Sequence, residues 1–192
     1  QDELIFDGGS MVVDGDGELL ARAPQFVDDL MILDLDLDPR DLEVALPLVE
    51  IAPSGVPTDA PTIDPPTIAA PLPSDAEVWE ALRLGLADYF GKGGFTEACL
   101  GLSGGIDSAL VAVLAADALG PDHVHAVSMP SQHSSDHSRD DAAVLAANLG
   151  LDYRTVAIEE MYHSFMDGLA GSFRGADADL TEENLQARIR GT

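Results

Sequence analysis

The sequence has 192 residues, of which 46% are hydrophobic, and its 35 acidic side chains outnumber the 9 basic ones for a net charge of −26. This length allows one complete hydrophobic core, or one core plus a fragment of another, and the acidic balance excludes nucleic-acid binding through a basic patch. No apolar run reaches the roughly 18 residues of a membrane-spanning helix, and no signal peptide is visible after Gln1. The single cysteine, Cys99, fits a reducing compartment. We therefore expect a cytoplasmic protein with an acidic, solvated surface.

The first 38 residues predict β structure, because short apolar runs alternate with turns rich in glycine and aspartate. The runs are Leu4–Phe6, Ser10–Val13 and Leu19–Ala21. Asp14–Gly17 has the first ligands of a calcium loop but not the closing glutamate, so we expect a plain hairpin turn. These strands have few partners of their own, and we expect them to be the end of a larger β-containing domain.

Residues 31–37 begin apolar and then alternate, which predicts a half-buried strand. Asp34, Asp36 and Asp38 would share one face of it, which we interpret as solvated rather than metal-binding. Residues 39–73 then contain nine of the twelve prolines and no periodic pattern. This composition predicts an extended, semi-rigid linker.

The remainder predicts alternating helices and strands. A helix is expected from the capping box Ser74–Glu77 to a stop at Gly91. The predicted strands are Glu97–Leu102, His123–Met129 and Tyr153–Ile158, and the predicted helices are Asp107–Leu119, Ser135–Leu149 and Thr181–Arg190. This order predicts an α/β fold with a doubly wound parallel sheet, in which ligands bind beyond the carboxyl ends of the strands.

A loop of serine and glycine, Ser103-Gly104-Gly105-Ile106-Asp107-Ser108, joins the first of these strands to its helix. It lacks both the Gly-Lys-Ser/Thr of a Walker loop and the Gly-x-Gly-x-x-Gly of a dinucleotide turn. Backbone N–H groups and the helix dipole at such a junction attract an anion, and adjacent glycines allow it to approach closely. Ser103 and Ser108 can donate to phosphate oxygens, and Asp107 can hold a Mg²⁺ ion that bridges the phosphates. The sequence thus predicts a phosphate or pyrophosphate site.

This loop resembles the pyrophosphate loop of the N-type ATP pyrophosphatases, which have an adenine nucleotide α-hydrolase-like fold. The loop alone is shared by asparagine, GMP and NAD synthetases and by tRNA-modifying enzymes. Two further stretches are similar to NAD synthetases: Met129–Ser135 with Asp140–Ala142, and Thr181–Gly191. Residues 1–38 also resemble the last strands of the nitrilase-like α/β sandwich that forms the glutaminase domain of glutamine-dependent NAD synthetases. The resemblance therefore implies a glutaminase end at 1–38, a linker at 39–73 and the first part of a synthetase domain at 74–192.

The resemblance also implies a function. ATP, as co-substrate, would be bound by Gly101, Leu102, Ser103, Gly104, Gly105, Ile106, Asp107 and Ser108. Asp107 would be a Mg²⁺ ligand, and Arg188 would bind deamido-NAD. The reaction implied is the ATP-dependent amidation of deamido-NAD with ammonia from glutamine, releasing AMP and pyrophosphate. No catalytic nucleophile is assigned, because the protein would act by positioning and charge neutralisation. The full-length protein would be a homo-oligomer.

Several alternatives stay open at this point. The loop also fits another amidotransferase or ligase, of the asparagine or GMP synthetase type, and a non-catalytic module that binds adenine nucleotides. Arg188 can instead be a surface residue paired with Glu182 or Glu183. We expect the glutaminase triad upstream of Gln1 and further ATP and Mg²⁺ ligands beyond Thr192, so this chain alone would not complete a turnover.

For the remaining reactive side chains we favour structural or solvent-exposed roles over catalytic or metal-binding ones. His133 stands where the family usually has an aromatic residue, and it can still stack or hydrogen-bond. His133 and His137 would suit a metal site if their segment were helical, but we favour a solvated loop and helix start. His123 and His125 share a strand face and are interpreted as structural. Cys99 is interpreted as a small core residue rather than a nucleophile.

Overall fold

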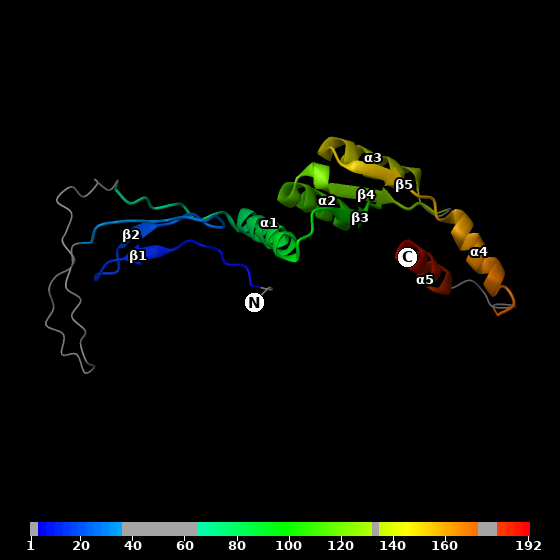
Figure 1. The fold of residues 1–192 in the computed structure, drawn as a ribbon, viewed down its shortest axis with the longest axis horizontal. Coiled ribbons are helices and arrows are strands. Elements are labelled where there is room, and N and C mark those ends of the chain that lie inside the picture. Colours follow the sequence, from blue (N-terminus) through cyan, green and yellow to red (C-terminus); the bar gives the residue numbers. More distant parts are fainter. Residues whose placement is uncertain (1–3, 36–64, 132–134, 173–179) are drawn as a thin grey trace. The chain divides into compact units, whose positions relative to one another are not determined.

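The computed structural model describes residues 4–35, 65–131, 135–172 and 180–192 (Figure 1). The chain divides into two compact units, one of Phe6–Glu77 and one of Val78–Thr192 with Gln1–Ile5. No helix within the described ranges is long and apolar enough to cross a lipid bilayer. The predicted phosphate loop lies in the second unit.

The first unit contains an antiparallel hairpin of β1 (Met11–Val13) and β2 (Leu19–Arg22). Asp14 Oδ1 accepts hydrogen bonds from the backbone N–H groups of Asp16 and Glu18, each at 2.9 Å. The carboxylate therefore closes the turn from within, as aspartate commonly does at such positions. The predicted hairpin turn is confirmed.

The predicted strand at 31–37 is wrong in its described part, because Met31–Leu35 is not in a strand. The alternating pattern alone is not sufficient, since a strand forms only where a neighbouring strand satisfies its backbone groups. Asp36 and Asp38 lie outside the described residues. Leu4–Phe6 is likewise not in a strand.

The end of the predicted linker pairs with the hairpin. Within residues 65–73, the Thr67 carbonyl accepts from the Arg22 N–H at 3.0 Å, and the Ala69 N–H donates to the Arg22 carbonyl at 3.0 Å. This stretch is therefore held along β2 by backbone hydrogen bonds rather than acting as a plain spacer. Residues 39–64 lie outside the described residues.

The second unit is built on a parallel three-stranded sheet in the order β3-β4-β5 (Figure 1). The strands are β3 (Ala98–Gly101), β4 (Val124–Ser128) and β5 (Asp152–Thr155). The connections are α2 (Ile106–Leu119) with the short helix η1 (Pro121–His123), and α3 (Asp136–Leu149). The predicted α/β fold with a parallel sheet is confirmed, and the carboxyl ends of β3 and β4 lie at one edge.

One face of the sheet is buried against α2 and α3. The core is formed mainly by small side chains from both layers: Leu102, Ala112, Ala115, Val124, Ala126, Ala142, Ala146 and Leu151. Such small residues let the helices approach the sheet closely. Cys99 lies on the other face and is exposed, so its assignment to the core is wrong. Successive residues of a strand face opposite sides, and it is the neighbouring Ala98 that packs on the core.

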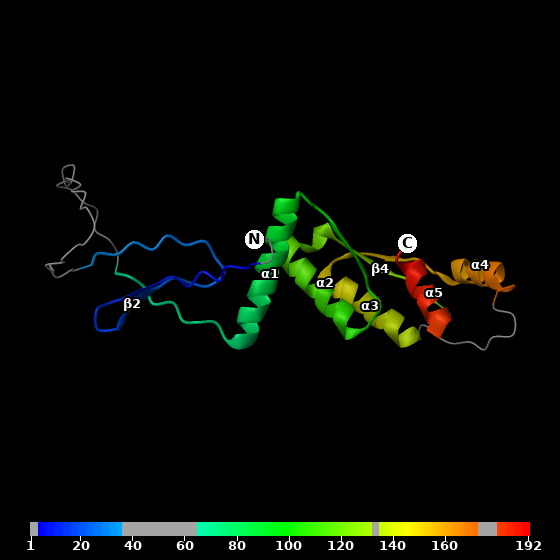
Figure 2. The same ribbon diagram turned by 90° about the horizontal axis from the view of Figure 1, so that it is seen from below.

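Three more helices complete the unit: α1 (Ser74–Gly93), α4 (Glu159–Leu169) and α5 (Leu180–Arg190). The first helix continues two residues beyond Gly91, where the sequence predicted its end. The fourth helix was not predicted, although its apolar residues recur at helical spacing from Met161 to Leu169. α4 and α5 lie side by side (Figure 2) and share a second core of Ile158, Tyr162 and Ile189.

Candidate functional site

The loop of Leu102–Gly105 connects β3 to α2 at the carboxyl edge of the sheet. Gly104 has a φ of +84°, and a Cβ atom there would lie 2.1 Å from the carbonyl oxygen of Ser138 in the first turn of α3. Both the backbone conformation and the missing side chain are therefore required, and only glycine supplies both. The loop is held against α3, so the first turns of α2 and α3 meet at one edge.

The two loop hydroxyls bind each other, with the Oγ atoms of Ser103 and Ser108 3.1 Å apart. Ser108 Oγ donates to the Gly105 carbonyl at 3.0 Å and accepts the Ser103 N–H at 3.3 Å. Ser103 Oγ accepts the Gly105 N–H at 3.3 Å. These bonds fix the shape of the loop. Because Ser108 donates its single proton to the Gly105 carbonyl, Ser103 is the donor between the two hydroxyls, and it reaches a ligand only by exchanging this one hydrogen bond.

Asp107 lies in the first turn of α2, whose N-cap residue Gly105 makes no side-chain capping bond. The N–H groups of this turn thus add to the positive end of the helix dipole. The Asp107 carboxylate is exposed and has no hydrogen bond or ion pair with any described residue. An unpaired carboxylate beside an anion site is typical of a ligand for a divalent cation that lies between the two.

A pocket of about 370 Å³ opens beside the loop. Its walls come from Gly101–Ser103, from the end of β4 through Pro130, from the first turn of α3 and from α5. Two of the nine basic residues, Arg139 and Arg190, line it, and no carboxylate is among the described residues that do. In a protein of such negative charge, this pocket is suited to an anion. Of the residues predicted to bind ATP, Gly104–Ser108 do not line it.

The stretch Thr181–Gly191 forms α5 and the residues around it. Arg188 is exposed, and no ion pair joins it to a described side chain. The side chain of Glu183, one alternative partner, is not described. Arg190 was not selected from the sequence, yet it reaches the pocket, where its Nε donates to the Met129 carbonyl at 3.2 Å. In the sequence it is a second arginine of the same motif, and nothing local distinguishes it from Arg188.

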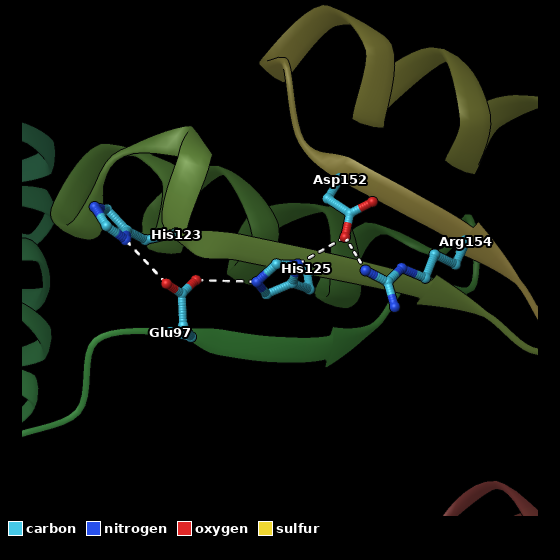
Figure 3. Close-up of polar contacts among 5 residues, drawn as sticks. All are labelled: Glu97, His123, His125, Asp152 and Arg154. Carbon is cyan, nitrogen blue, oxygen red and sulfur yellow. Dashed lines mark hydrogen bonds and ion pairs between the residues drawn. The ribbon is translucent and has the colours of Figure 1, made fainter.

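A charged cluster lies at the opposite, amino end of the strands (Figure 3), formed by Glu97, His123, His125, Asp152 and Arg154. His125 Nδ1 is 2.7 Å from Asp152 Oδ2, and its Nε2 is 2.9 Å from Glu97 Oε2. A neutral imidazole has one N–H, so both contacts are hydrogen bonds only when the ring is protonated. This pairing supports the structural interpretation of the two histidines.

Electrostatics within the cluster follow from these bonds. The hydrogen bond to Asp152, and after it the one to Glu97, raises the pKa of His125 above its ordinary 6.5. The same bonds from His125 are the main reason that the pKa values of Glu97 and Asp152 are lowered. When His125 is protonated, its charge and that of Arg154 balance the carboxylates of Glu97 and Asp152.

The other predicted sites have less support. His133 lies outside the described residues, so its interpretation stays a prediction. His137 is exposed at the start of α3, with Nδ1 3.7 Å from Asp141 Oδ1. In the part of the chain that the structure describes, no group of three or more histidine, cysteine, aspartate or glutamate side chains is arranged to hold a metal ion.

Comparison with known proteins identifies the family. Residues 78–192 match the family model described as NAD synthase. The chain belongs to the NAD synthase family. It is 42% identical over 205 residues to the glutamine-dependent NAD(+) synthetase of Thermotoga maritima and 43% identical over 192 residues to that of Rhodobacter capsulatus. Both matches cover the whole chain but only 35% and 31% of the relatives, so the chain spans about a third of their length.

Solved structures agree with this assignment. Glutamine-dependent NAD+ synthetase from Acinetobacter baumannii, in complex with ADP, matches all of this chain and 32% of its own length, with a TM-score of 0.76 and 36% identity. NMN synthetase from Francisella tularensis matches 61% of this chain and 47% of its own, with a TM-score of 0.54 and 30% identity. The predicted fold and the resemblance to NAD synthetases are both confirmed.

Proposed function

We propose that the intact protein is a carbon–nitrogen ligase that converts deamido-NAD to NAD. The nicotinate carboxylate attacks the α-phosphorus of ATP, and pyrophosphate leaves. Ammonia from glutamine then opens the adenylate to the amide and releases AMP. The observation that carries the proposal is the glycine loop beside a pocket that no described carboxylate lines, at the edge of the sheet where such folds bind ligands. Membership of the NAD synthase family supports the choice of acid.

ATP would lie with its phosphates against the residues 101–108. The fixed loop and the uncapped start of α2 offer backbone N–H donors, and the Ser103 hydroxyl can turn to join them. Their task is to hold the α-phosphorus in line with the attacking carboxylate and to stabilise the charge that develops on it. No covalent bond to the protein is needed.

Magnesium fits this site. Mg²⁺ binds through one or two carboxylates together with substrate phosphates, so the Asp107 carboxylate, which has no partner among the described residues, can be one of its protein ligands. When bound, the ion would neutralise phosphate charge that otherwise repels Asp107.

Deamido-NAD would contact Arg188, whose exposed guanidinium offers a planar pair of donors to a phosphate or carboxylate. We also propose that residues 1–38 end a glutaminase domain, that 39–73 link it to the synthetase domain at 74–192, and that the intact protein is a homo-oligomer. Light scattering of the intact protein measures the last point directly.

The proposed reaction is tested by identifying the products formed from ATP labelled at its α-phosphorus. The intact protein is incubated with α-labelled ATP, Mg²⁺, deamido-NAD and glutamine, and we expect AMP, pyrophosphate and NAD in equal amounts. Release of ADP and phosphate would contradict the adenylate mechanism. ATP binding without AMP formation from any acid would instead indicate a non-catalytic nucleotide module.

A panel of acids tests the substrate. One matched structure is named NMN synthetase, so the mononucleotide acid belongs in the panel beside deamido-NAD, aspartate and XMP. We expect deamido-NAD to give the highest kcat/KM. A preference for the mononucleotide would keep the adenylate chemistry and change the substrate.

A further inference from the structure

Arg190 connects helix α5 to the pocket. Its side chain is half-buried, and its Nε donates to the Met129 carbonyl at 3.2 Å. The described residues give its two Nη groups no hydrogen bond or ion pair. The guanidinium is therefore held in place at one corner while four N–H donors remain for another partner. Half-buried donors of this kind are costly unless an anion or water meets them.

No carboxylate among the described residues pairs with the charge of Arg190. Its recorded partner is a neutral carbonyl, and no described carboxylate lines the pocket. The loop also carries no lysine, which in a Walker loop reaches the phosphates. A polyphosphate in this pocket thus needs a cation from elsewhere in the chain, and Arg190 supplies one.

Helix geometry gives the two arginines of α5 different tasks. Residues two apart on an α-helix are separated by about 200° around its axis. Ile189 between them is buried against Ile158 and Tyr162, which docks the helix. Arg190 consequently lines the pocket while Arg188 is exposed.

We propose that Arg190 binds the polyphosphate of ATP, so that α5 carries one arginine for each substrate. This proposal rests on the proposed function, which gives Arg188 to deamido-NAD. A guanidinium offers two parallel N–H donors to phosphate oxygens, and such charge-assisted pairs are stronger than neutral hydrogen bonds.

The experiment measures dissociation constants of ATP, AMP and adenosine for the intact protein. We expect Arg190→Gln to weaken the binding of ATP by about 10- to 100-fold. The binding of AMP should weaken less, and the dissociation constant of adenosine should not change. Arg190→Lys keeps the positive charge but lacks the planar pair of guanidinium donors, and its loss of ATP affinity should be smaller than that of Arg190→Gln. The matched control is Arg83→Gln, which removes the same charge from a half-buried pair with Glu80 on α1 and should bind ATP like the parent protein.

Each other outcome has a definite meaning. Unchanged ATP affinity in Arg190→Gln overturns the proposal, and so does an equal loss for ATP and adenosine, since a residue that merely docks α5 would affect both. Arg188→Gln should raise the KM for deamido-NAD without changing the ATP dissociation constant, and the reverse assignment of the two arginines would also overturn it. Failure of the parent protein to bind ATP refutes the proposed function itself, before any variant is made.

Discussion

The two ends of the parallel sheet use charge in opposite ways. At the amino end, His125 lies between Asp152 and Glu97 with contacts of 2.7 and 2.9 Å, and the charges cancel (Figure 3). At the carboxyl end, Arg190 donates to a backbone carbonyl, and no carboxylate in the described ranges neutralises its charge. The same three strands therefore carry a self-neutralised cluster at one end and a pocket open to an anion at the other.

This difference shows how an acidic protein can keep a pocket that is suited to an anion. With 35 carboxylates in the chain, their absence from the described lining of the pocket matters as much as the presence of arginine. The carboxylates at the amino end are compensated by histidine and arginine side chains, which limits their reach. Changes at the carboxyl end should therefore affect binding, and changes at the amino end should affect stability.

The largest effect is expected from Gly104→Ala. The new Cβ would lie 2.1 Å from the Ser138 carbonyl oxygen, at a φ of +84° that alanine rarely adopts, so the loop has to move away from α3. We expect ATP affinity to fall by about 100-fold or more, as measured by calorimetry. Gly91→Ala is the control, because nothing lies within 4 Å of its added Cβ. Normal ATP binding in Gly104→Ala would show that the loop is not part of the ATP site.

A smaller effect, seen only in the Mg²⁺ dependence of turnover, is expected from Asp107→Asn. This change removes the charge that would hold the ion while leaving the helix and loop in place. Turnover of the intact protein at limiting Mg²⁺ should fall by roughly 100-fold, and ATP binding in EDTA should not weaken. Asp122→Asn, an exposed aspartate before β4, is the matched control. Equal losses with and without Mg²⁺ would contradict the metal role.

The amino end should respond to pH. His125 has a raised pKa, so its stabilising contribution is complete below 6.5 and is lost as the pH rises through the raised value. Glu97 and Asp152 have lowered pKa values. Their stabilising contribution is therefore complete above their ordinary pKa values of 4.5 and 3.8, and it is lost as the pH falls through the lowered values. The contribution is therefore greatest between about pH 4.5 and 6.5.

His125→Gln tests this directly by urea unfolding at several pH values. The parent protein should lose stability above pH 6.5, and the variant should lose this part of the pH dependence. His163→Gln, which removes a histidine 3.8 Å from a single carboxylate of Glu159, is the control. ATP affinity should not change in either variant. An ATP affinity that follows the state of His125 would show that the two ends are coupled.

The fold was largely predictable because its signals are local. Apolar periodicity and the turn residues located the three strands of the parallel sheet, with ends displaced by up to a few residues. The strand at 31–37 failed because alternation does not reveal whether a partner strand exists. The assignment of Cys99 failed because the pattern does not tell which face of β3 the helices cover.

The site residues also fall into two groups, those that the sequence reveals locally and those that only the fold reveals. The loop at Ser103–Ser108 was recognisable since its glycines, hydroxyls and carboxylate are consecutive in sequence. Arg190 was not, because its importance depends on Met129, 61 residues away, and on the docking of α5. No local pattern distinguishes Arg190 from Arg188; the fold does, by placing one in the pocket and leaving the other exposed.

The smallest effect is expected from Cys99→Ser, on the open face of β3. Cys99 pairs in register with His125, and an imidazole is a common base for a cysteine nucleophile. Both nitrogens of His125 already face carboxylates, so this imidazole does not serve the thiol as a base. We expect the free energy of unfolding to change by less than about 0.5 kcal/mol and turnover to stay unchanged. A loss of turnover would place chemistry at the amino end and remove the distinction between the two ends.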